Sequence, residues 1–200
     1  MRLPFKNKNR KKFLEYAYKI NSAKYLNPIQ KLISETIMNW ANINNLSFSD
    51  SIQMLNKIDN RFDNIKKIHK AFLNCFYDTD QTNESFNTLI SNTNVDFSRY
   101  YFFYSNYLLS KNNIQQANLI IEDALTTNPR NLILNQLRSD LQKSKNLALA
   151  DKFNCKNISH SLAEILYVVS NALSSQSIYT ASNYYLNLAK FLNPDFTSYK

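Results

Sequence analysis

Apolar residues recur at every third or fourth position along most of this chain, which is the spacing of one face of an α-helix. The clearest run covers residues 28–43, and its stripe consists of Ile29, Leu32, Ile33, Ile37 and Trp40. Pro28 opens this run and Asn27 precedes it, so we predict the first helical turn and its N-cap here. Ser47 is a second N-cap candidate.

Similar stripes follow to the end of the chain, separated by short polar breaks that are rich in Asn. They lie at residues 47–58, 61–78, 83–90, 98–111, 114–127, 131–143, 161–176 and 178–195. A shorter pattern precedes them at 11–26, and residues 145–157 are ambiguous between a short helix and a loop. No segment alternates as a strand would, so the patterning predicts an all-α fold of about ten helices.

Composition agrees with helices. The chain of 200 residues has no Gly and only four Pro, while hydrophobic residues make up 44% of it. Tight hairpin turns, phosphate-binding loops and nucleophile elbows need Gly, so its absence argues against all-β folds and against those sites. Helices joined by Asn-rich turns need none, because Asn tolerates the left-handed conformation. The hydrophobic content is sufficient for the core of one domain.

Positive charge is concentrated at the start of the chain. Residues 1–31 hold nine Lys and Arg against one acid, and the rest holds fifteen bases and fourteen acids, so +8 and +1 sum to the net charge of +9. We define the basic arm as Arg2, Lys6, Lys8, Arg10, Lys11 and Lys12. Two interpretations are open. The arm binds nucleic acid or an anionic membrane surface, or it is simply a solvated end of the chain. Of the possible partners, we expect protein and not nucleic acid.

The residue types that carry chemistry form no recognisable set. Cys75 and Cys155 have no CxxC spacing, and we predict buried reduced thiols rather than a disulfide. His69 and His160 have no metal-ligand spacing and no HExxH motif. We therefore predict no metal, no cofactor and no enzymatic activity. The alternative is an unfamiliar enzyme whose Cys–His pair is assembled by the fold.

Two helical hairpins align with each other when their closing Asn-Pro pairs are superposed, at Pro129 and Pro194. The aligned pairs are Tyr101 with Leu166, Tyr104 with Val169, Ser105 with Ser170, Leu108 with Leu173, Ala117 with Ser182, Ile121 with Leu186 and Ala124 with Ala189. This order of large and small positions resembles the tetratricopeptide repeat, a helix–turn–helix unit of about 34 residues. The resemblance implies an α-solenoid, a right-handed superhelix of antiparallel helix pairs.

The resemblance divides the chain into a basic segment at 1–27 and a repeat domain at 28–200. Its units are predicted at about 28–59, 62–92, 98–131 and 163–196. The two prolines are 65 residues apart rather than about 68, so residues 132–162 are expected to form an extra helix and a loop. The final hairpin has no polar capping helix after it, which predicts self-association or missing sequence.

The last hairpin is also similar to bacterial tetratricopeptide-repeat proteins that are longer and begin with an exported segment. This chain is then a shortened member or a fragment. No run of 18 apolar residues suggests a transmembrane helix, and no secretory signal is recognisable. The chain as given is expected in the cytoplasm; it would be periplasmic or membrane-associated if an exported start precedes it.

In the repeat family the first helix of each unit lines a concave groove that binds proteins. By alignment, the groove residues are Arg99, Phe102, Asn106, Leu109, Glu164, Tyr167, Asn171 and Ser174. The resemblance thus implies a non-catalytic scaffold that binds a peptide or a partner helix. Phe102 and Tyr167 either face this groove or contact the core of a neighbouring unit. Residues 100–104 are all aromatic, so their helix should be buried on several sides.

Overall fold

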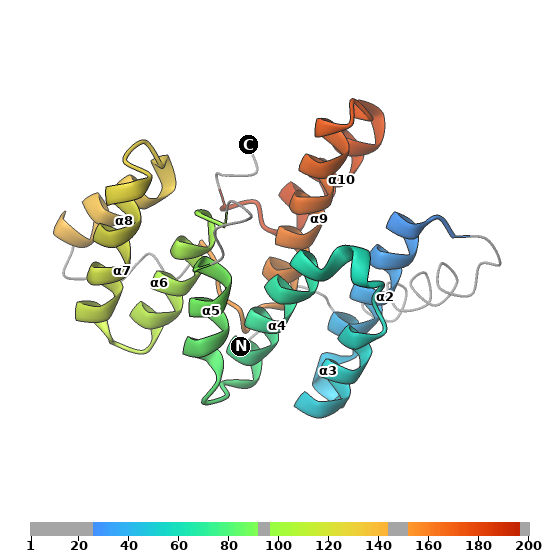
Figure 1. The fold of residues 1–200 in the computed structure, drawn as a ribbon, viewed down its shortest axis with the longest axis horizontal. Helices are drawn as coiled ribbons and strands as arrows, with labels where there is room; N and C mark the ends of the chain where they lie inside the picture. Colours follow the sequence, from blue (N-terminus) through green and yellow to red (C-terminus); the bar gives the residue numbers. More distant parts are fainter. Residues whose placement is uncertain (1–25, 92–96, 144–151, 197–200) are drawn as a thin grey trace.

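Nine α-helices make up most of the residues that the structure, a computed structural model, describes: 26–91, 97–143 and 152–196 (Figure 1). They are α2 (Pro28–Asn42), α3 (Phe48–Asn56), α4 (Asp63–Tyr77), α5 (Thr82–Ile90), α6 (Tyr100–Ser110), α7 (Ile114–Thr127), α8 (Leu132–Lys143), α9 (Ile158–Ser175) and α10 (Tyr179–Leu192). Two 3-10 turns, at Ile43–Asn45 and Asn60–Phe62, complete the set. These residues contain no strand, which confirms the all-α prediction for them. The pattern at 11–26 lies almost wholly outside the described residues.

Local sequence determines where the helices begin and end. The Asn27 side chain accepts a hydrogen bond from the Gln30 amide at 2.8 Å, and Gln30 returns one to the Asn27 amide, so the predicted cap of α2 is confirmed. Ser47 caps α3 in the same way. A chain without Gly still needs left-handed residues at its turns, and in the described residues these positions are held by Asp78, Asn112 and Ser177.

Small residues lie where paired helices cross. Ala117 and Ala124 of α7 are fully buried against α6. In the last pair the Ser170 hydroxyl of α9 donates to the main-chain oxygen of Ser182 in α10 at 2.8 Å. Helices approach this closely only where no large side chain intervenes. The alignment that placed small residues at these positions therefore identified true crossing points in both pairs.

The helices do not follow one another in a simple row. Helices α2 and α3 lie at one end of the molecule and α7 and α8 at the other, with α4, α5 and α6 between them (Figure 1). The chain then turns back, and α9 packs against α2 and α4. In a regular repeat array each unit contacts the units before and after it. The last helix pair departs from that order, because α9 packs on helices from the first part of the chain while α10 projects from the molecule (Figure 1).

Aromatic side chains dominate the core between α4, α5 and α6. The Phe72 ring is in contact with the rings of Phe86, Tyr100 and Phe103, at centroid separations of 5.3 to 6.4 Å. Four of the five aromatic residues at 100–104 are buried, and Tyr101 is half-buried. The prediction that this helix is covered on several sides is therefore confirmed.

Candidate functional site

The α6 residues assigned to the predicted groove are covered by other parts of this chain. Phe102, Asn106 and Leu109 are each at most 3% exposed, and Arg99 is half-buried. The Phe102 ring stacks on Phe196, with 5.3 Å between the ring centroids. An open groove along α6 is therefore wrong, because residues that follow α10 occupy the space in which a partner would lie.

The equivalent residues of α9 divide into two groups. Glu164 is fully buried and Tyr167 is half-buried, facing the core. Asn171 and Ser174 are exposed near the end of α9. Only these last two of the eight predicted groove residues are open to solvent. The return of α9 brings Glu164 and Tyr167 against the start of α6, whereas Asn171 and Ser174 lie beyond this contact.

Arg99 and Glu164, predicted as separate groove residues, bind each other. The Arg99 Nε and Nη2 atoms donate to the two Glu164 carboxylate oxygens, each at 2.7 Å. The Tyr100 hydroxyl also donates to Glu164 Oε1 at 3.3 Å. Burial, and after it the Glu164 charge, raises the pKa of Tyr100 well above its ordinary value. Such a pair offsets its desolvation cost only through good geometry and additional hydrogen bonds.

Aromatic rings hold the Arg99 guanidinium in place. Its central carbon lies 4.3 Å from the centroid of the Tyr167 ring and 4.9 Å from that of the Phe196 ring. These separations are typical of cation–π contacts. The Arg99–Glu164 pair thus joins the start of α6 to the first half of α9 and stabilises the return of the chain.

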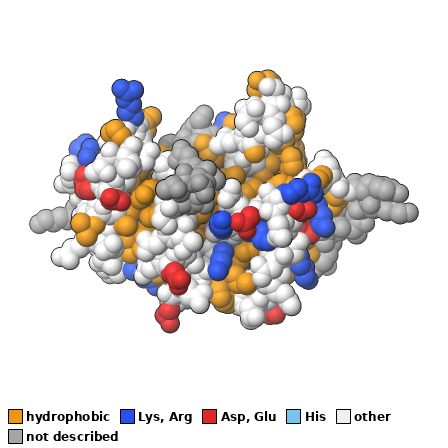
Figure 2. All heavy atoms as spheres, viewed as in Figure 1, with side chains coloured by type: hydrophobic (Ala, Val, Ile, Leu, Met, Phe, Trp, Pro, Cys, Tyr) orange, Lys and Arg blue, Asp and Glu red, His pale blue; other side chains and the backbone are white. Residues whose placement is uncertain are grey.

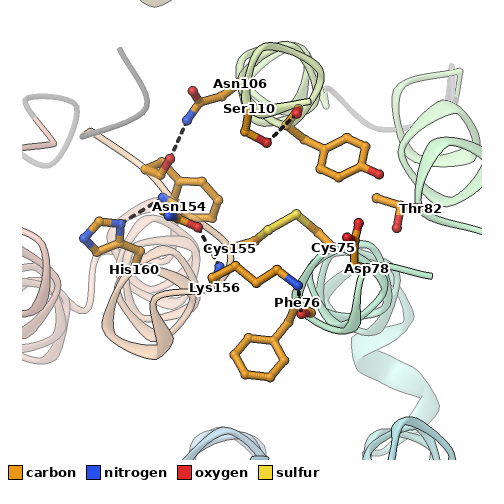
Figure 3. Close-up of a disulfide and its surroundings, with 12 residues drawn as sticks. Cys75, Phe76, Asp78, Thr82, Asn106, Ser110, Asn154, Cys155, Lys156 and His160 are labelled. Atoms are coloured by element: carbon orange, nitrogen blue, oxygen red, sulfur yellow. Dashed lines mark hydrogen bonds between the residues drawn. A yellow bond between two sulfur atoms is a disulfide. The ribbon is translucent and has the colours of Figure 1, made fainter. Parts of the chain in front are cut away.

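Residues 152–157, which we call the strap, cover the middle of α6. Cys155 of the strap forms a disulfide with Cys75 of α4, with 5.9 Å between the Cα atoms (Figure 3). The prediction of reduced thiols is therefore wrong. The side-chain amide of Asn106 donates to the main-chain oxygen of Phe153 (Figure 3). The centroid of the Phe153 ring lies 4.5 Å from that of the Phe103 ring.

Further hydrogen bonds hold both ends of the strap. Asn193, beyond α10, donates to the Lys152 main-chain oxygen at 2.9 Å. The main-chain amide of Asn154 donates to His160 Nδ1 at 3.0 Å, and the Lys156 ammonium donates to the main-chain oxygen of Phe76 (Figure 3). The strap therefore links α4 and α6 to both helices of the last pair.

The two histidines are structural acceptors in this arrangement. His69 accepts a hydrogen bond from Trp40 Nε1 at its Nδ1 atom, at 3.0 Å, and complete burial lowers its pKa to about 3. Burial also lowers the pKa of His160, and the Asp195 carboxylate opposes that shift. Both cysteines are in the disulfide, so neither is a thiol beside a histidine. In the described segments no three His, Cys, Asp or Glu residues are grouped to hold a metal ion.

Among the described residues, the last helix pair carries more exposed large apolar side chains than any other pair. Ile178 and Tyr179, at the start of α10, are 45% and 60% exposed, and Tyr184 and Phe191, which share the outer face of α10, are 61% and 76% exposed. Helix α10 packs mainly on α9 and buries only Ser182 and Ala189. Figure 2 shows hydrophobic side chains at the tip and along the flank of this projecting hairpin.

Charge is nearly missing from the same hairpin. Between residues 158 and 192 the sequence holds one carboxylate, the buried Glu164, and one ammonium, Lys190. The missing capping helix had pointed to this hairpin, but the patterning did not identify its exposed side chains, although the run from Tyr179 to Phe191 has aromatic residues on its polar side. That excess of aromatic residues on an amphipathic helix is the signal that would have identified it.

The basic arm lies outside the described residues, so its two interpretations stay predictions. None of the helices of the described part has the length and hydropathy needed to cross a membrane. No protein-family model, no curated protein and no solved structure matches this chain.

Proposed function

We propose that the protein is a non-catalytic interaction module and that it binds a helix of another protein on the outer face of α10. The exposed aromatic residues of this almost uncharged hairpin are the observation that carries the proposal. Centres of protein interfaces are depleted in charged residues and enriched in Tyr and Phe. An apolar group of this kind on a protein surface is typical of a binding site.

The spacing of the side chains suits a helical partner. Tyr184 and Phe191 are seven residues apart, which places them two turns apart on one face of α10. At a rise of 1.5 Å per residue they are separated by about 10 Å along the helix axis. A helix with apolar residues at successive turns would contact both, in the way that amphipathic helices bind apolar surfaces. The near absence of charge selects against a strongly charged partner.

The likeness to the tetratricopeptide repeat supports the same function. We infer that the helix pairs form a short right-handed solenoid of that type, modified by the return of α9. The buried small residues Ala117, Ala124 and Ala189 support this inference, because they lie where the repeat requires close helix crossing. The last helix of such an array has an apolar face on which a further unit would stack. A partner helix on α10 would take that place.

The test uses the full chain with a photo-crosslinking residue at position 184, compared with the same residue at position 132. Leu132 is a matched control, because it is 84% exposed and lies on α8. We expect a partner to crosslink at 184 and not at 132, and to be retained at about 0.5 M salt, where interactions between exposed charges are screened. Crosslinking to a second copy would identify the partner as the protein itself.

The variant Phe191→Lys should abolish capture, whereas Leu132→Lys should leave it intact. Equal capture by both variants would show that the α10 face is not the binding surface. Loss of every bound protein at about 0.5 M salt would instead favour the basic arm, with nucleic acid or an anionic surface as its ligand.

A further inference from the structure

We propose that the strap is a built-in ligand of the surface between α4 and α6, and that its disulfide controls access to that surface. When the Cys75–Cys155 bond is reduced, a short peptide with an aromatic residue can replace the strap. We call this surface the strap seat and define it by Phe72 and Cys75 of α4 with Phe103 and Asn106 of α6. The inference concerns a different surface from α10 and does not depend on the function proposed above.

The strap seat has the chemistry of a peptide-binding site. The ring of Phe153 lies 4.5 Å from Phe103 and 5.1 Å from Phe72, so one aromatic side chain fills a site built from two others. Beside it the Asn106 amide binds the main-chain oxygen of the same residue. Every peptide has that oxygen, so the seat selects a main chain through Asn106 and an aromatic side chain through the two rings.

The strap faces the seat with two side chains and then turns. Phe153 and Cys155 are buried, Asn154 between them is half-buried and Lys156 is exposed. The Asn157 main-chain amide donates to the main-chain oxygen of Asn154 at 2.9 Å, and this turn carries Lys156 away from the seat. Besides the disulfide, the strap binds α4 and α6 through the Phe153 ring, the Phe153 main-chain oxygen and the Lys156 hydrogen bond to Phe76, and a second peptide can supply all three groups. The covalent bond is therefore the feature that a competing peptide cannot match.

Reduction by a dithiol removes that advantage in two balanced steps. A thiolate of the reductant attacks Cys155 Sγ, the bond between the two sulfurs breaks, and Cys75 leaves as a thiolate that takes up a proton. The second thiolate of the reductant then attacks the reductant sulfur that is bonded to Cys155. Cys155 leaves as a thiolate and is protonated, and the reductant becomes a cyclic disulfide. Cys155 is 8% exposed and Cys75 is 2% exposed, so attack at Cys155 is the accessible route.

The space beside the disulfide is too small for the reductant. A hollow of about 30 Å³ is lined by both cysteines together with Asn106, Ser110 and Asn154. Figure 3 shows Ser110 above the bridge and Asn154 to the left of it. A volume of this size admits a water molecule but not a dithiol. Reduction therefore requires the strap to lift slightly, which couples reduction to opening of the seat.

The first experiment measures binding of a fluorescent peptide to the full chain. The peptide has the sequence of residues 152–158 with Cys155→Ser, so that it cannot exchange disulfides. We expect it to bind the dithiol-reduced protein at least about tenfold more tightly than the oxidised protein. A matched peptide that also carries Phe153→Ala should lose this binding. Equal affinity for the two redox states, or equal binding of the two peptides, would overturn the proposal.

The second experiment follows hydrogen exchange in the full chain without any peptide. Amide exchange in the strap should rise at least about tenfold on reduction, while exchange in α3, which packs on α2 and α4 and is not part of the strap seat, should change much less. The Cys75→Ser/Cys155→Ser variant should match the reduced protein; if it fails to fold, the reduced wild type gives the same measurement. Unchanged strap exchange, or an equal rise in α3, would show that the disulfide is no latch for this segment.

Discussion

Replacing Glu164 by Gln should destabilise the fold by about 3 kcal/mol. The substitution keeps the shape of the side chain but removes its charge, and it turns an amide NH₂ toward the Arg99 guanidinium. Two charge-assisted hydrogen bonds of 2.7 Å depend on that carboxylate. Breaking a buried ion pair costs about 3–5 kcal/mol. Because the Arg99 side chain is 18% exposed, water can partly hydrate the remaining charge, so we take the lower end of this range.

The assay is urea unfolding followed by circular dichroism, with a double-mutant cycle that adds Arg99→Met. The double variant has no unpaired charge in the core, so it should be more stable than Glu164→Gln alone, and the coupling energy should be about 2 kcal/mol or more. A loss below about 0.5 kcal/mol would contradict this reasoning. That result would restore these residues to a binding role, since a groove residue contributes little to stability.

Three further predictions concern the core. Ala124→Leu should cost about 1–3 kcal/mol by overpacking the crossing of α6 and α7, whereas the same change at the exposed Ala172 should cost less than about 0.5 kcal/mol in urea unfolding. Burial lowers the pKa of His69 from 6.5 to about 3. Between these two pH values the unfolded chain therefore binds a proton at His69 and the native chain does not. Stability should then decrease by about 1.4 kcal/mol per pH unit, and His69→Gln should remove that part of the slope in pH-dependent unfolding; an unchanged slope would show that His69 is protonated in the fold. Reduction of the disulfide, which spans 80 residues, should lower the free energy of unfolding by about 4 kcal/mol, measured with and without a dithiol; equal midpoints would contradict this.

Local features of the fold could be predicted well from the sequence. The cap at Asn27 and the helix that it begins depend on residues within one turn of each other. The small residues at the helix crossings follow a period that survives in a single sequence, as Ala117 and Ala124 show. The burial of residues 100–104 followed from aromatic residues on every side of one helix. In each case the information lies within one helix or one hairpin.

The contacts that close the molecule could not be predicted in this way. Arg99 and Glu164 are 65 residues apart, and each alone is an ordinary polar residue on a helix face. Cys75 and Cys155 are 80 residues apart with no repeated spacing, so nothing local indicates a bond. The repeat alignment found the small residues at the helix crossings but assumed that successive pairs stack in order. The return of α9 broke that assumption and turned the predicted groove into core.

The position of α9 has a consequence for how the protein is made. During synthesis α2 leaves the ribosome before the other described helices, yet α9, one of the helices that packs on it, begins only at Ile158. Domains begin to fold while the chain is still growing, and contacts between distant parts of a sequence form late. The face of α2 that packs on α9 is therefore covered only when the last fifth of the chain has been made. Until then α2 is an apolar surface in need of protection, and a chaperone that binds the nascent chain would find it there.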